Sequence, residues 1–162
     1  NTPYRRFKKW NHEGGIKTPL IVNWPGVIEP GRVTSAVGHI MDFMPTFSEL
    51  ANASFPDNID GSPLNSIDGK SLLPIFTDTA GTQHNALFWQ SNPREHRAVR
   101  QGDWKLVSQG DDFETELYNL ATDPSENTDL AVIMPEKVAE LDSLFYHWAS
   151  QMNIEDQEYI EY

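Results

Sequence analysis

The second half of the chain alternates short apolar runs with turn signals, and this alternation limits the folds available to it. Runs this short and this close together can be joined only by tight turns, which predicts an antiparallel meander. Gln101-Gly102-Asp103, between two of the runs, is a strong hairpin signal. The expected strands are Asn85–Gln90, Arg97–Arg100, Trp104–Ser108 and Thr115–Asn119. We therefore expect a four-stranded antiparallel sheet.

Residues 136–152 follow the predicted sheet and place apolar side chains at helical spacing. Pro135 suits the first turn of a helix, where its missing N–H costs little. The side chains expected on one face are Val138, Leu141, Phe145, Trp148 and Met152. The pattern predicts a helix that packs across the sheet.

The first half of the chain carries weaker signals. The apolar run Thr18–Trp24 has the length and β-branched content of a buried strand, and Asp42–Ala51 has the spacing of a short helix. The small polar stretch Thr77–Gln83 separates this half from the meander, so we divide the chain into domains at residues 1–81 and 82–162. Four further residues are expected in the core: Met41, Met44, Trp104 and Trp148.

Basic residues are concentrated at the start of an acidic chain. The first 17 residues hold five Lys or Arg and one Glu, whereas the whole chain carries a formal charge of −12. The acidic surface formed by the rest of the chain would repel a polyanion. The basic edge therefore favours a small anionic ligand or an acidic neighbour within the fold rather than nucleic acid. No apolar run is long enough to predict a membrane-spanning helix.

The end of this basic stretch reads His12-Glu13-Gly14-Gly15. The two glycines permit positive φ and a close approach of the backbone. We interpret Glu13 as a residue that holds the turn through backbone N–H groups. His12 could act as a general acid or as a hydrogen-bond donor to a substrate, because its ordinary pKa lies near neutrality, but from the residues alone we interpret it as structural. The acidic residues from Asp111 to Asp129 lack the pattern of a calcium loop and are expected to form a solvated face.

Several motifs, taken together and in order, resemble the second half of the formylglycine-dependent sulfatases, arylsulfatase-like enzymes of the alkaline phosphatase superfamily. The residues that carry the resemblance are Asn1–Arg5, Lys8, His12–Ile16, Thr18–Ile21, Trp24–Gly26, Asp42–Thr46, Asp68–Leu72, Arg97–Leu106, Glu116–Leu120, Asp123, Pro124 and Glu126. They extend over nearly the whole chain, up to about Met152.

The resemblance implies an α/β fold of the alkaline phosphatase-like type. Residues 1–81 would supply the last core strand and helix of the catalytic domain, and residues 82–162 would form a small C-terminal subdomain. The implied enzyme is a sulfuric ester hydrolase in which a hydrated formylglycine attacks sulfur and Ca²⁺ polarises the sulfate oxygens. Lys8 falls on the family's sulfate-binding lysine. Weaker candidates for substrate binding are Lys9, His12 and His96.

In the sulfatases that this chain resembles, the formylglycine motif and the metal ligands lie upstream of the position that corresponds to Asn1. We therefore expect this stretch alone to bind no metal and to lack activity. The expected partners are a sulfated small molecule or glycan, the missing N-terminal part of the same protein and, through exposed core residues, a second copy of the chain. The resemblance also implies a periplasmic, secreted or lysosome-like location.

Two alternatives remain open at this point. A phosphodiesterase or phosphonate monoester hydrolase of the same superfamily would use a similar cationic edge on a phosphoryl group. From a different class, a non-catalytic binding module would use the basic edge to contact an acidic partner.

Overall fold

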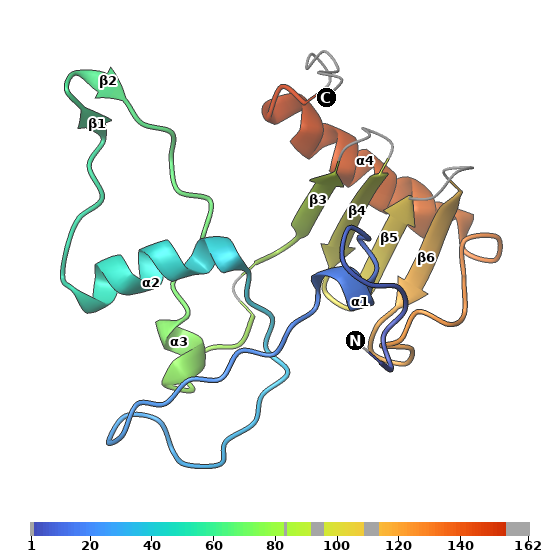
Figure 1. The fold of residues 1–162 in the computed structure, drawn as a ribbon. Coiled ribbons are helices and arrows are strands. Elements are labelled where there is room, and N and C mark those ends of the chain that lie inside the picture. The colour runs from blue at the N-terminus through green and yellow to red at the C-terminus, as the bar shows by residue number, and fades with distance from the viewer. Residues whose placement is uncertain (1, 83, 92–95, 109–113, 155–162) are drawn as a thin grey trace. The chain divides into compact units, whose positions relative to one another are not determined.

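The computed structural model describes residues 2–82, 84–91, 96–108 and 114–154. The chain divides into two compact units, which Figure 1 draws as a ribbon. Unit 1 combines Asn1–Pro19 with Asn85–Tyr162, and unit 2 is Leu20–His84. The first 19 residues therefore belong with the second half of the chain. The predicted division into domains at residue 81 stays a prediction.

Unit 1 contains the predicted meander, an antiparallel sheet in the order β3-β4-β5-β6. Its strands are β3 (Leu87–Ser91), β4 (His96–Gln101), β5 (Trp104–Ser108) and β6 (Thr115–Asn119). Val99 lies opposite Leu106, which in turn lies opposite Leu117, so these three side chains share one face. The four strands are confirmed, each within two residues of its expected start and end.

Helix α4 (Pro135–Gln151) covers the face of the sheet that carries these three residues, as predicted. The core cluster consists of Val99, Leu106, Leu117, Leu141, Phe145 and Ala149. Trp148 stacks on Phe88 with ring centroids 4.8 Å apart. Met152 follows the last helical residue and is 41% exposed, so its assignment to the packed face is wrong.

Unit 2 is built from short elements. The predicted helix near residue 42 is confirmed as a 3-10 turn, η1 (Ile40–Asp42), followed by α2 (Phe43–Leu50). The remaining elements are β1 (Asn58–Ile59), β2 (Ser62–Pro63) and α3 (Leu73–Phe76). Met44 is 54% exposed, because none of the described residues of unit 2 covers its side chain, and its assignment to the core is therefore wrong.

The strand predicted at Thr18–Trp24 is absent, and these residues form no ladder with any described part of the chain. Their apolar side chains remain largely open, with Ile21 90% exposed. An extended segment becomes a strand only when a neighbour accepts and donates its backbone hydrogen bonds. The described residues of unit 2 offer no such neighbour. None of the described helices is long and apolar enough to cross a membrane.

Candidate functional site

Residues 2–19, called the N-terminal segment below, cover the face of the sheet opposite α4 (Figure 1). The register places Lys105 beside Tyr118 on that face, because side chains alternate along each strand. Arg5 of the segment donates hydrogen bonds to the Tyr118 hydroxyl and to Glu116. The segment also contributes the short helix α1 (Glu13–Ile16), which carries a buried glutamate. The two ends of unit 1 are thus joined by polar contacts.

Three charged side chains, called the buried ion triad below, lie at the centre of this contact. The Lys105 ammonium is 2.8 Å from a carboxylate oxygen of Glu13 and 2.8 Å from one of Glu126. The side chains are 0%, 3% and 0% exposed, respectively. The backbone N–H of Glu13 donates to the second carboxylate oxygen of Glu126 at 2.7 Å. The triad therefore fixes both the side chain and the backbone of Glu13.

A second polar cluster surrounds Glu116. One of its carboxylate oxygens accepts from Arg5 at 2.9 Å, and the other lies 2.5 Å from Nε2 of His12. Burial raises the pKa of the Glu116 carboxyl, but the hydrogen bond from His12 and the charges of His12 and Arg5 outweigh it, so the pKa lies below its ordinary value. Burial and the neighbouring Glu116 carboxylate raise the pKa of Tyr118. This cluster keeps a carboxylate ionised against the sheet.

Gly14 and Gly15 allow the segment to fold back on itself. A Cβ on Gly14 would lie 2.3 Å from the carbonyl oxygen of Arg6, and one on Gly15 would lie 1.9 Å from that of Trp10. The predicted close approach is confirmed, but it is made to carbonyl groups of the same segment. Neither glycine has a positive φ, because both lie within α1.

Two interpretations of acidic residues are corrected here. Glu13 holds the turn, but its carboxylate binds buried Lys105, and its own N–H is taken by Glu126 rather than by an external anion. Glu126 belongs to the stretch expected to form a solvated face and is 0% exposed. A buried cation attracts both carboxylates, and nothing within a few residues of either one in the sequence indicates this.

Lys8 lies in a tight turn, Phe7–Trp10, of the N-terminal segment. The N–H of Trp10 donates to the carbonyl of Phe7 at 3.1 Å, which places Lys8 and Lys9 at the two central positions. Lys9 has φ +77°, a left-handed conformation that is uncommon for a residue other than glycine. Lys8 is exposed, and its ammonium makes no hydrogen bond or ion pair with any residue that the structure describes.

The other predicted site residues occupy different environments. Lys9 is exposed next to Lys8, whereas His12 is 1% exposed with Nε2 bonded to Glu116. His96 begins β4 opposite Ser91, on the face that also carries Lys105. Their roles in substrate binding stay predictions. Sequence reasoning missed Lys105, although Val107, two residues away on the same face, is apolar and signals that this face is covered.

Unit 2 has a buried polar centre of its own around Asp42. Its carboxylate accepts from Nε2 of His84 at 2.7 Å and from the backbone N–H groups of His39 and Lys70. Burial lowers the pKa of His39, although the Asp42 charge opposes this shift. These bonds tie the start of α2 to two later segments, so we read the cluster as structural.

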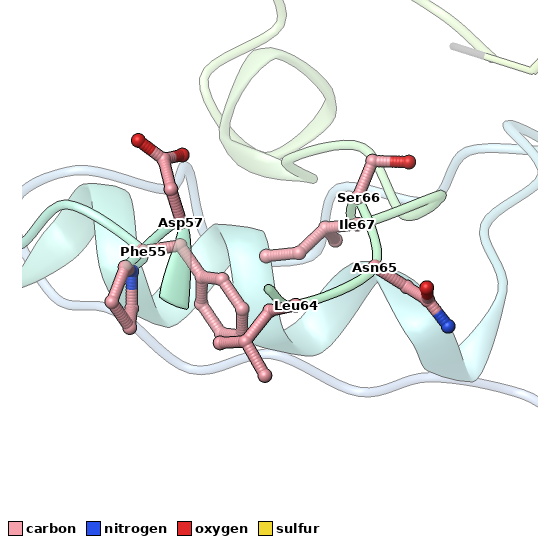
Figure 2. Close-up of a pocket in the computed structure, with 7 residues that line it drawn as sticks. Phe55, Asp57, Leu64, Asn65, Ser66 and Ile67 are labelled. Atoms are coloured by element: carbon pink, nitrogen blue, oxygen red, sulfur yellow. The ribbon is translucent and has the colours of Figure 1, made fainter. Parts of the chain in front are cut away.

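A pocket of about 370 Å³ lies in unit 2 beside the β1–β2 hairpin (Figure 2). Its lining residues are Phe55, Pro56, Asp57, Leu64, Asn65, Ser66 and Ile67. The one charged side chain among them is a carboxylate, so the pocket offers no counter-charge to an anionic ligand. Among the described residues, no group of three or more His, Asp or Glu side chains could hold a metal ion.

Most of this chain is similar in sequence to known proteins. Residues 4–153 match the family model described as N-sulphoglucosamine sulphohydrolase, C-terminal. A sulfatase of Formosa agariphila is 34% identical over 152 residues, which span 85% of this chain and 27% of that protein. Arylsulfatase A of Homo sapiens is 32% identical over 148 residues, spanning 76% of this chain and 28% of that protein.

A solved structure of a protein in complex with its substrate D-glucosamine-2-N,6-O-disulfate is also similar. The sequence identity is 27% and the TM-score is 0.62, over 84% of this chain and 28% of that chain. The chain thus spans less than a third of the length of these relatives. The matched part includes both the Lys8 turn and the sheet that supports it.

Proposed function

Because this chain belongs to the sulfatase family, within the C-terminal region that the family model describes, we propose that it serves a sulfuric ester hydrolase by supplying Lys8 to the sulfate site. The fold is accordingly that of the C-terminal part of an alkaline phosphatase-like enzyme, with its small antiparallel sheet and terminal helix. The activity of the whole protein is part of the proposal. The proposed substrate is a sulfate ester of a small molecule or glycan.

The availability of Lys8 is the observation that carries this proposal. Other cations of the N-terminal segment are engaged: Arg5 pairs with Glu116, Arg6 lies over the Trp10 ring and Lys17 lies near Glu13. Lys8 keeps an exposed ammonium without a described partner. A lysine ammonium is a compact point charge, suited to stabilising the negative charge that develops on sulfate oxygens as the ester bond breaks.

Sulfatases generally use a formylglycine nucleophile and Ca²⁺, which supply the attack on sulfur and the polarisation of its oxygens. The residues of this chain do not fit either group, since the sequence lacks the Cys/Ser-x-Pro-x-Arg motif from which formylglycine is made, and the described residues include no group of three or more His, Asp or Glu that could hold a metal ion. In our proposal both groups come from other parts of the full-length protein. This chain contributes a cation that binds and orients the substrate.

The exposed apolar residues of unit 2 support the proposal that the rest of the full-length protein packs against them. Ile40, Met44 and Phe47 are 76%, 54% and 62% exposed and share one side of the η1–α2 region by helical spacing. A monomeric surface rarely leaves large apolar patches open. We expect the remaining catalytic domain to cover this side. The chain alone should dimerise through this apolar side. The double variant Met44→Glu/Phe47→Glu should be a monomer, as measured by sedimentation.

The test of the proposed function is Lys8→Ala in the full-length sulfatase. Removing one donor to a developing oxyanion lowers the rate by about 10²–10³-fold, and we expect kcat/KM for an aryl sulfate to fall on this scale. Lys137→Ala, which removes a partly buried lysine of α4 that pairs with Glu140, is the control and should retain the wild-type value. A wild-type rate for Lys8→Ala would contradict the assignment.

Two further measurements test the proposal, one on the chain alone and one on the substrate preference of the full-length protein. The chain by itself should not hydrolyse an aryl sulfate, and measurable turnover would show that the required groups are present within it. The full-length protein should prefer an aryl sulfate to an aryl phosphate of the same leaving group. The reverse preference would favour a phosphoryl-transfer enzyme of the same superfamily.

A further inference from the structure

The triad Glu13–Lys105–Glu126 is a costly way to attach a segment to a sheet. Removing charges from water is expensive, and buried ion pairs often add little net stability compared with apolar residues of similar volume. The other face of the same sheet is covered mainly by apolar packing, with one partly exposed ion pair, Arg97–Asp142, between β4 and α4. A buried triad does, however, specify one arrangement, because each carboxylate and the ammonium must meet at hydrogen-bond distance.

The contacts lead from this triad to the Lys8 turn in two steps. Lys105 and Glu126 hold Glu13, whose neighbour Gly14 donates its N–H to the carbonyl of Arg5 at 2.9 Å. Gly15 lies against the carbonyl groups of Trp10 and Phe7, the two residues that close the turn. Both ends of the turn therefore lie against Gly15, and the two residues before it, Arg5 and Arg6, lie against Gly14.

The turn itself needs this support. Arg6 and Lys9, on either side of Phe7 and Lys8, have φ of +67° and +77°. Left-handed conformations of residues other than glycine persist only where the surrounding structure enforces them. The position of the Lys8 side chain therefore depends on the backbone conformation of the turn, which the contacts at Gly14 and Gly15 maintain.

We propose that Lys105 and Glu126 are positioning residues that set the place of the Lys8 ammonium through Glu13 and the glycine pair. The proposal rests on the proposed function of Lys8. It concerns residues that touch no substrate, since both are fully buried beneath the segment. Small displacements of a charged group from its working position are costly, and a shift of about 1 Å can lower a rate about 10²-fold.

The test uses Lys105→Met and Glu126→Gln in the full-length sulfatase, with turnover of an aryl sulfate as readout. Glu126→Gln keeps the shape and an oxygen for the Glu13 N–H, so it is the milder change. We expect kcat/KM to fall at least about 10-fold for both variants, mainly in kcat, because Lys8 acts on charge that develops in the transition state.

Two controls separate positioning from stability. Leu106→Met introduces the same residue at the adjacent position, on the apolar face, and should keep kcat/KM within about twofold. Leu141→Ala destabilises unit 1 from the α4 side and should also keep its rate. All rates are measured at a temperature at which circular dichroism shows each variant to be folded. If Lys105→Met does not fold, Glu126→Gln carries the test.

The decisive comparison places Glu126→Gln in a Lys8→Ala background. If Glu126 acts through Lys8, the double variant should be no slower than Lys8→Ala alone. Multiplying losses, or a wild-type rate for Glu126→Gln where Lys8→Ala is impaired, would overturn the positioning role and leave the proposed function standing. A wild-type rate for Lys8→Ala would instead overturn the proposed function.

Discussion

The face of the β3–β6 sheet beneath α4 is covered mainly by apolar side chains, and its Arg97–Asp142 ion pair is partly exposed, whereas the opposite face is covered through fully buried charges. Val99, Leu106 and Leu117 meet α4 on the first face. Lys105, one position from Leu106 on the same strand, meets Glu13 and Glu126 on the second. Apolar packing tolerates small shifts of the covering element, but hydrogen-bonded ions do not. The difference places the element that needs exact positioning on the charged face.

The largest effect is expected for Lys105→Met. The methionine fills much of the same volume but leaves Glu13 and Glu126 buried without their cation, which should cost about 3–5 kcal/mol of unfolding free energy. Leu106→Met on the apolar face should cost less than about 1.5 kcal/mol. Urea denaturation of the two variants measures both values. Equal losses would show that the two faces do not differ in this way.

The apolar face should respond to lost volume rather than lost charge. Leu117→Ala truncates a side chain that is 0% exposed and should cost about 3 kcal/mol, because the cavity collapses only in part. This loss should be the same at pH 5 and pH 8, since the core residues of this side are apolar and the bond from the Leu117 backbone N–H to Asp129 is present in both proteins. A strong pH dependence would mean that the two faces are coupled.

A smaller effect is expected for Glu116→Gln at neutral pH, about 1–2 kcal/mol, from the loss of charge-assisted hydrogen bonds to Arg5 and His12. The pKa of Glu116 in the folded chain lies below the ordinary 4.5, so its stabilisation is present above about pH 4.5 and is lost as the pH falls through the folded-state pKa. Wild type and variant should therefore converge in acid. Glu140→Gln, in an exposed pair, is the control and should change little at either pH.

The sequence was sufficient to predict the sheet and α4, because both depend on local signals. Alternating apolar residues, the turn at Gly102 and the helical spacing after Pro135 each act within a few residues. The apolar face of unit 1 follows directly from these patterns. The signals between the N-terminal segment and α2 were less complete, since the strand predicted at Thr18–Trp24 requires a neighbouring strand that the described residues do not provide.

The charged face could not be predicted in the same way. Glu13 lies 92 positions from Lys105 and its N–H bonds a carboxylate 113 positions away, so no local pattern relates them. The resemblance to sulfatases indicated Lys8 but gave no reason for its location. Glu126 looked solvated because acidic residues surround it in the sequence, and only the fold brings it to the buried ammonium.

The most direct test of the account is hydrogen exchange in the 162-residue chain, compared between Lys105→Met and Leu106→Met. In Lys105→Met, the amides of Trp10, Gly14 and Lys17, which bond within the N-terminal segment, should lose protection while those of α4 keep it. Leu106→Met should leave the segment protected. Unchanged protection of the segment in Lys105→Met, or equal loss across both faces, would contradict the claim that the buried ion triad holds the Lys8 turn in place.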